Sequence, residues 1–199
     1  MNKGIKMAHC EYLNSMNSGD CFYDDKVLLC IDERQLTEDI IVGRDYHYNA
    51  QTQQGFSTIL PQRISMLTFY IQSLPHQCSF FKKELFNDTL YDESLTIVAD
   101  TKFHIQKICV EGCSIKLIDE IVCRREPDGI SKSYNERRIA EHHKVLAEFL
   151  PQGARKDYDT LKSLDKTTLY KFIHLLETSK ASKWLTCLIK IIYRIKVVI

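Results

Sequence analysis

The sequence has almost no excess of charge of either sign. Lys and Arg together number 27, and Asp and Glu number 26, so the formal net charge is +1. A protein dedicated to nucleic acid carries a basic surplus that neutralises phosphates. The charge balance therefore argues against nucleic acid as a partner.

Residues 1–8 lack the apolar run of a secretory leader, and they have no clear helix start. They resemble the last turns of a helix whose opening is missing. The eight cysteines are scattered, without two matching Cys-x-x-Cys pairs. We predict reduced, mostly buried thiols in a cytoplasmic protein, with zinc as the minor alternative.

What is present is typical of one globular domain. The 199 residues are 44% hydrophobic and 27% charged, which is enough to bury a real core. We predict strands over 11–16, 39–43 and 114–123, helices or helical turns over 24–31, 64–71, 82–86 and 99–110, a loop or hairpin tip at 51–55, and helices after 133 separated by Pro151 and Gly153. Strands and helices that alternate before a helical tail indicate an α/β sheet with appended helices.

The segment Asn17-Ser-Gly-Asp20 follows the first predicted strand and allows two interpretations. Asn, Ser, Gly and Asp are common turn residues that simply end a strand. Alternatively, Asp20 lies at the carboxyl end of a strand to bind a metal and a phosphate, where open α/β sheets bind their ligands. The residues alone favour the turn.

A series of ordered motifs adds to this reading. Asn2-Lys-Gly-Ile-Lys-Met-Ala8 precedes Glu11-Tyr-Leu and Asn17-Ser-Gly-Asp20; further on come residues 75–86, 91–95, 97–100 and 129–131. Together these resemble the inverting family-two glycosyltransferases of bacterial surface-polysaccharide synthesis, over about residues 1 to 150. The resemblance implies a partial GT-A (Rossmann-like) nucleotide-diphospho-sugar transferase fold over 1–132 and a helical extension over 133–199.

The resemblance also implies roles for particular residues. Asp20 would bind Mg²⁺ or Mn²⁺ under the diphosphate of a nucleotide-sugar donor, because these ions prefer carboxylate and phosphate oxygens. Asp100 would be the catalytic base that takes a proton from the acceptor hydroxyl. The substrate-binding residues implied are Asn17, Ser18, His76 and Ser131.

Each of these residues has a simpler interpretation. Asp100 directly precedes a predicted helix, so it is also an ordinary N-cap, and its pKa would then be held low. A histidine after a proline, as at His76, is more often structural, and Ser131 is as easily a turn residue.

Three positions depart from the family pattern. Gly19 stands where many members have another aspartate, which weakens a ribose or metal contact. Cys10 replaces a glycine, so we expect a strained or altered turn there. Asn14 and Ser15 interrupt a strand that would be continuously apolar in the centre of a parallel sheet.

The opening strands of the family's domain have no counterpart in this sequence. We therefore expect segment 11–16 to present a bare sheet edge and the isolated chain to bind nucleotide sugars poorly. The function expected is glycosyl transfer to a glycan or lipid-linked acceptor. The alternative is a non-catalytic remnant or a subunit that depends on a partner.

Residues 183–199 alternate apolar residues with Lys190, Arg194 and Lys196, which is too many charges for a membrane-crossing helix. They suit an amphipathic helix on an anionic surface, and hence a cytoplasmic protein that is peripheral at the inner membrane. A helix docked on the catalytic domain is the equal alternative.

Overall fold

The computed structural model of the chain describes residues 1–49, 51–125 and 135–165. The chain divides into two compact units, Met1–Phe149 and Leu150–Ile199. The first unit thus continues past residue 132, where the sequence suggests a boundary, and it includes α6 (Asn135–Phe149).

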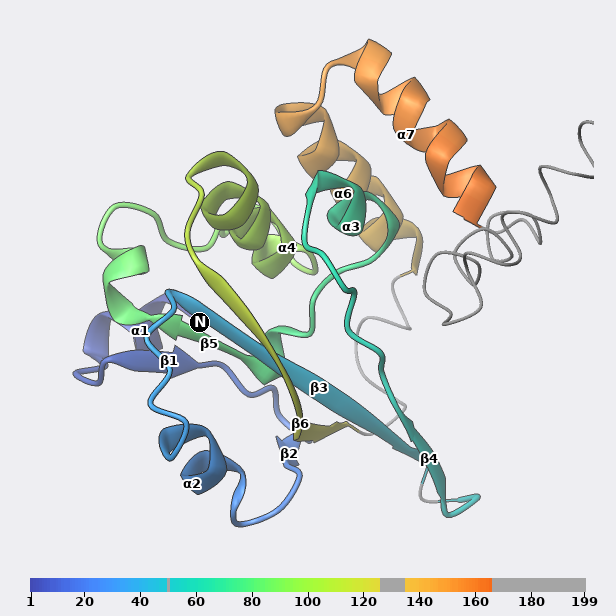
Figure 1. The fold of residues 1–199 in the computed structure, drawn as a ribbon. Helices are drawn as coiled ribbons and strands as arrows, with labels where there is room; N and C mark the ends of the chain where they lie inside the picture. The colour runs from blue at the N-terminus through green and yellow to red at the C-terminus, as the bar shows by residue number, and fades with distance from the viewer. Residues whose placement is uncertain (50, 126–134, 166–199) are drawn as a thin grey trace, which may run out of the picture. The chain divides into compact units, whose positions relative to one another are not determined.

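The first unit is built on a mixed sheet with the strand order β1-β5-β3-β6-β2, and β4 pairs with β3 as a hairpin (Figure 1). In this sheet β3 and β6 are parallel, while the other described pairs are antiparallel. The strands are β1 (Tyr12–Asn14), β2 (Cys21–Phe22), β3 (Ile40–Asn49), β4 (Gln54–Ser57), β5 (Ser79–Lys82) and β6 (Ile115–Arg125).

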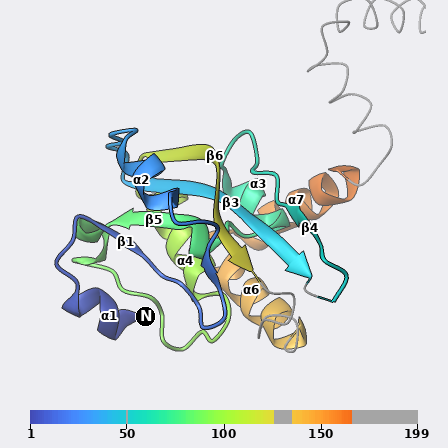
Figure 2. The same cartoon turned by 90° about the horizontal axis from the view of Figure 1, so that it is seen from below.

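Helices cover both faces of this sheet. In Figures 1 and 2, α2 lies on one face and α4 on the opposite face. The α-helices are α1 (Asn2–Met7), α2 (Val27–Asp32), α3 (Met66–Ile71), α4 (Ala99–His104), α6 and α7 (Gln152–Asp165), accompanied by the 3-10 turns η1 (His76–Cys78) and η2 (Lys83–Phe86) and the π-helical η3 (Ile105–Val110). The predicted mixed α/β fold with C-terminal helices is confirmed.

Alternation along β5 builds a core on each face. Phe80 belongs to the cluster around Val27 of α2, together with Ile41 of β3. The next residue, Phe81, contacts the ring of Phe103 on α4 at a centroid distance of 5.5 Å. Because successive side chains of a strand point to opposite faces, one short strand serves both layers.

Gly43 allows β3 and β6 to approach closely. A Cβ atom at this position would lie 2.4 Å from Val122 Cγ2 and 2.9 Å from the backbone oxygen of Glu120. The register shifts on both sides of Arg44, which marks a bulge. Residues beyond the bulge continue the strand into the β3–β4 hairpin.

The strand β1 lies at one end of the sheet order, where β5 is its partner. The predicted bare edge is therefore present in the described residues. β1 is not the central strand of a parallel sheet, which would have to be continuously apolar, because it runs antiparallel to β5 at the end of the sheet order. The structure explains why this strand contains the polar residue Asn14: Asn14 Nδ2 donates hydrogen bonds to the carbonyls of Gln77 (2.9 Å) and Ser79 (3.0 Å).

Most local predictions are confirmed, including the hairpin tip and the stop of the helix near Gly112, whose φ is +72°. Three are corrected. Gly153 lies inside α7, so only Pro151 stands between the last two described helices. Cys10, which replaces the family's glycine, does not have a positive φ, so the backbone there is not strained. Strand β5 was not predicted.

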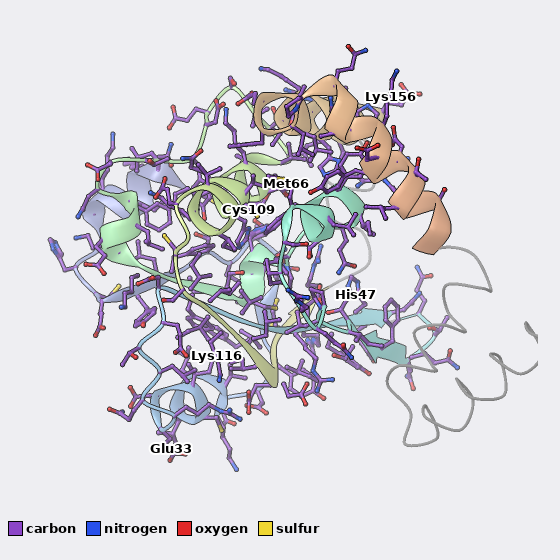
Figure 3. All side chains as sticks on the ribbon, turned by 45° about the horizontal axis from the view of Figure 1, so that its top comes forward. Glu33, His47, Met66, Cys109, Lys116 and Lys156 are labelled. Carbon is purple, nitrogen blue, oxygen red and sulfur yellow. The ribbon has the colours of Figure 1, made fainter. Side chains whose placement is uncertain are left out.

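Free thiols are found at all seven cysteines of the described residues, but the expectation that they are mostly buried is wrong. Cys78 and Cys123 are buried, whereas Cys10, Cys21 and Cys30 are exposed. Figure 3 labels Cys109 on η3 near Met66 of α3, and these two elements are in contact.

No helix among the described residues is long and apolar enough to span a membrane. The predicted amphipathic helix at 183–199 lies outside the described residues.

Candidate active site

Residues Asn17 to Asp20 form a tight turn that leads into β2. The backbone N–H of Asp20 donates to the carbonyl of Asn17 at 3.1 Å. Gly19, at the third position, has a φ of +94°, as type II turns require. An aspartate at this position would be strained, which gives a backbone reason for glycine here. The turn interpretation of this segment is therefore confirmed.

The carboxylate of Asp20 is held by the residue next to the candidate histidine. Gln77 Nε2 donates a hydrogen bond to Asp20 Oδ2 at 2.9 Å. Gln77 is buried, while Asp20 is half-buried. The backbone carbonyl of Gln77 also accepts a bond from Asn14 of β1, so η1 and β1 fix it from two sides.

His76 joins the turn to the start of α4. Its Nδ1 lies 2.8 Å from Asp100 Oδ2, and its Nε2 lies 3.3 Å from Asn17 Oδ1. Pro75 precedes it with an extended backbone, as expected from the sequence, and η1 then turns the chain into β5. In the sequence, Asn17 lies about 60 residues before His76, and Asp100 lies 24 residues after it.

Asp100 lies within the first turn of α4 and is 9% exposed. Its Oδ1 accepts the backbone N–H of Thr101 at 2.7 Å. Burial by itself would raise the pKa of Asp100. The hydrogen bond from His76, the neighbouring His76 and His104 imidazoles and the Thr101 N–H outweigh burial, so the pKa of Asp100 lies below its ordinary value. Asp100 is therefore ionised near neutral pH.

The N-cap interpretation of Asp100 is wrong. Val98 occupies the N-cap position, and its side chain makes no cap hydrogen bond. The N–H groups of the segment that leads into the helix are bound by Glu141 of α6, whose carboxylate accepts from Thr96 (3.1 Å), Ile97 (2.9 Å) and Val98 (3.3 Å). Asp100 accepts only within the first turn, through Oδ1, and its Oδ2 faces His76.

His104, one helical turn after Asp100, lies fully buried beneath this pair. Burial lowers the pKa of His104 to about 4, so its ring is neutral at neutral pH. Its Nε2 lies 3.4 Å from Ser79 Oγ. The region below Asp100 is thus uncharged and packed.

The structure brings four of the predicted site residues together: Asn17, Asp20, His76 and Asp100. Ser18 is exposed in the turn, and Ser131 lies outside the described residues. Sequence reasoning gave Gln77 little weight and missed Asn14 and Glu141. Their only sequence signal is polarity next to a motif, since their contacts span 43 to 65 residues.

The donor set around Asp20 limits the kind of cation that it could hold. Among the described residues, no group of three or more His, Cys, Asp or Glu side chains is arranged around a metal position. A single half-buried carboxylate fits a hard cation that keeps water and phosphate oxygens as its other ligands. It does not fit zinc in a structural site, which needs four protein ligands.

A cavity of about 100 Å³ lies elsewhere, between the loop before α4 and α4 itself. It is lined by Thr89, Leu90, Asp92, Ala99, Lys102, Phe103 and Gln106. Small-molecule sites usually exceed about 300 Å³. We therefore locate the candidate site by its polar side chains, which lie outside this cavity.

Comparison with known proteins gives similarities among solved structures only. The sequence matches no protein-family model, and the curated proteins contain no match. Among solved structures, the chain is similar to the crystal structure of S. aureus TarS 1-349 in complex with UDP, with 14% sequence identity and a TM-score of 0.49. The match covers 92% of this chain and 55% of the other, so the chain spans about half the length of that structure.

Proposed function

We propose that this chain is a glycosyltransferase domain that moves a sugar from a nucleotide-sugar donor to a hydroxyl of a glycan or lipid-linked acceptor. One observation carries the proposal. Three side chains that the sequence motifs single out lie in one row: His76 Nδ1 is 2.8 Å from Asp100 Oδ2, and His76 Nε2 is 3.3 Å from Asn17 Oδ1. The fourth, Asp20, is bound by the neighbour of His76.

The His76–Asp100 pair supplies the base. Attack of an acceptor oxygen on the anomeric carbon needs a group that takes the hydroxyl proton in the transition state. Asp100 is ionised, and its partner His76 is half-buried and reaches toward the exposed turn. Such a pair can hold a proton at the surface of the site while its carboxylate stays packed.

Asp20 holds the divalent cation in this proposal. Mg²⁺ or Mn²⁺, when bound, would offset the charge that grows on the leaving diphosphate. Gln77 fixes one carboxylate oxygen of Asp20. Asn17 and Ser18, exposed in the same turn, and Ser131 bind the donor or acceptor. The amphipathic segment 183–199 brings the domain to a membrane surface and its lipid-linked acceptor.

A second candidate is a partner-dependent, non-catalytic subunit, and the edge of β1 favours it. In the described residues β1 pairs with β5 on one side only. An unpaired strand edge offers backbone N–H and C=O groups to another chain. Under this second proposal the chain does not bind nucleotide by itself, and it binds nucleotide only when a partner chain pairs with β1.

Isothermal titration with UDP in the presence of Mn²⁺ tests the proposed function. We expect the wild-type chain to bind weakly, Asp20→Ala to bind at least about tenfold more weakly still, and the matched variant Asp25→Ala to bind as wild type, because Asp25 is exposed outside the turn. Equal binding by Asp20→Ala would contradict the metal role. No binding by the wild-type chain would favour the partner-dependent subunit.

A further inference from the structure

Both oxygens of Asp100 already have partners. Oδ1 accepts the N–H of Thr101 at 2.7 Å, and Oδ2 faces His76 Nδ1 at 2.8 Å. The side chain is almost buried, and its lowered pKa makes it a weak base. An acceptor hydroxyl would therefore have to displace an existing hydrogen bond to reach Asp100.

The imidazole of His76 is better oriented toward a substrate. With Nδ1 directed at Asp100, the opposite nitrogen, Nε2, points toward the exposed Asn17. Asn17 Oδ1 lies 3.3 Å from Nε2, and with the ring proton on Nδ1 neither of these two atoms has a hydrogen to donate. A hydroxyl could approach Nε2 from this side without breaking a strong contact.

We propose that Nε2 of His76 is the proton acceptor of the transfer reaction and that Asp100 is a positioning residue. The inference rests on the proposed function. The carboxylate of Asp100 holds the proton of neutral His76 on Nδ1, which leaves a lone pair on Nε2. This is the arrangement in which a base is oriented by a third group.

The step balances in atoms and charge. The O–H bond of the acceptor breaks, and its proton forms a bond to Nε2 of His76. The oxygen electron pair forms the new bond to the anomeric carbon, while the bond from that carbon to the diphosphate oxygen breaks and its electrons leave with the diphosphate. Nothing is oxidised or reduced.

The surroundings stabilise the imidazolium that results. Asp100 carries the negative charge at Nδ1, and Asn17 Oδ1 can accept the new Nε2–H. His104, the other titratable group of α4 near this ring, stays neutral because burial lowers its pKa to about 4. From the turn and η1 the neighbours are Asn17 and Gln77, which do not titrate, and beyond Gln77 the carboxylate of Asp20, which accepts a hydrogen bond from Gln77 Nε2 at 2.9 Å.

The tautomer of His76 can be measured without any substrate. In the ¹⁵N spectrum of the labelled full chain, the His76 signals are those that His76→Gln removes. We expect the Nδ1–H tautomer of His76 above neutral pH. In Asp100→Asn this preference should be lost, because the variant has no carboxylate to accept the hydrogen bond from Nδ1–H. A predominant Nε2–H tautomer in the wild type would overturn the proposal, whatever the donor sugar is.

The second measurement is UDP release from UDP-glucose and UDP-N-acetylglucosamine, with water or added glycan as acceptor. We expect His76→Gln to lower kcat by about 10²- to 10⁴-fold with little change in KM and to abolish the fall in kcat at acidic pH. His143→Gln, on the exposed face of α6, serves as the matched control with unchanged rate. Asp100→Asn should lower kcat and shift the acidic limb without abolishing it.

The alternative outcomes separate the inference from the function it rests on. If Asp100→Asn loses all activity while His76→Gln keeps its rate and its pH profile, Asp100 is itself the base and the proposal is overturned. If the wild-type chain releases no UDP and binds none, the proposed function fails, and the proton acceptor proposed for it falls as well.

Discussion

Two buried aspartates in the first unit each contact a histidine, but their other partners differ. Asp45 on β3 is 1% exposed and lies 2.8 Å from Arg125 Nη1 and 3.1 Å from His47 Nε2. Figure 3 labels His47 in this region. Asp100 is 9% exposed, and within the described residues it forms its ion pair with His76.

The two aspartates differ in whether the positive charge beside them is permanent. A guanidinium stays protonated at any pH at which proteins fold, so Arg125 commits Asp45 to a fixed ion pair. Thr58 Oγ1 also donates to Asp45 and ties β3 to the segment after β4. The imidazole of His76 beside Asp100 carries no such permanent charge. In our proposal the buried carboxylate is therefore structural at Asp45 and serves proton transfer at Asp100.

Replacing each aspartate by asparagine tests this contrast and gives the largest effect. Asp45→Asn leaves the Arg125 charge without its partner, so we expect a loss of about 3–5 kcal/mol in the free energy of unfolding. Asp100→Asn keeps an acceptor for Thr101 N–H and faces a histidine that can be neutral, so we expect about 1 kcal/mol or less. Urea denaturation of both variants measures the difference.

The exposed Asp119 provides the control, because its contact with Arg44 is at 3.8 Å on the surface. Asp119→Asn should unfold as wild type within about 0.5 kcal/mol. Equal destabilisation by Asp45→Asn and Asp100→Asn would remove the contrast between a structural and a functional carboxylate.

Glu141 sharpens the comparison because it supports the helix that carries Asp100. Burial would raise the pKa of Glu141, but the N–H groups of Ile97 and Thr96, the Arg137 side chain and the Val98 N–H lower it below its ordinary value. A carboxyl whose pKa is lower in the folded state stabilises the fold at neutral pH. This contribution is lost as the pH falls through the folded-state pKa.

We therefore expect Glu141→Gln to cost about 1.5–3 kcal/mol at neutral pH and much less at acidic pH, where Glu141 is itself protonated. Hydrogen exchange at residues 96–98 should increase in the variant. The exposed Glu136, also on α6, gives the control Glu136→Gln. Unchanged exchange in Glu141→Gln would show that α4 starts without this carboxylate.

The smallest effect is expected at Thr58, the neutral partner of Asp45. Thr58→Val keeps the shape of the side chain but removes one hydrogen bond, while Arg125 and His47 continue to hold the carboxylate. We expect a loss of about 1 kcal/mol in stability, measured by thermal unfolding. A loss as large as that of Asp45→Asn would mean that the hydroxyl, and not the ion pair, fixes Asp45.

Much of the fold could be predicted because its signals are local. The apolar run at Ile40–Val42, the helical spacing after Ala99 and the turn residues at Asn17–Asp20 each follow from neighbouring residues. Strand β5 could not be predicted in this way. Its four residues are a strand because β1 and β3 pair with them on either side, and those strands are far away in the sequence.

The candidate site shows the same limit. The motifs singled out His76 and Asp100 separately, and the resemblance assigned the role of base to the carboxylate. The contact between Nδ1 and Oδ2, which transfers that role to the imidazole in our proposal, joins residues from η1 and α4. The cap formed by Glu141 was equally hidden, because it reaches α4 from a helix more than 40 residues later.

The sequence by itself determined the residue types at the site, the turn at Gly19 and the apolar run at Ile40–Val42. These depend on backbone sterics and on side-chain polarity, which act between neighbours. The tertiary structure decided which aspartate faces a permanent charge in addition to a histidine and which, in the described part of the chain, forms its ion pair with a histidine alone. That choice depends on distances between segments, and such distances are fixed only when the chain packs.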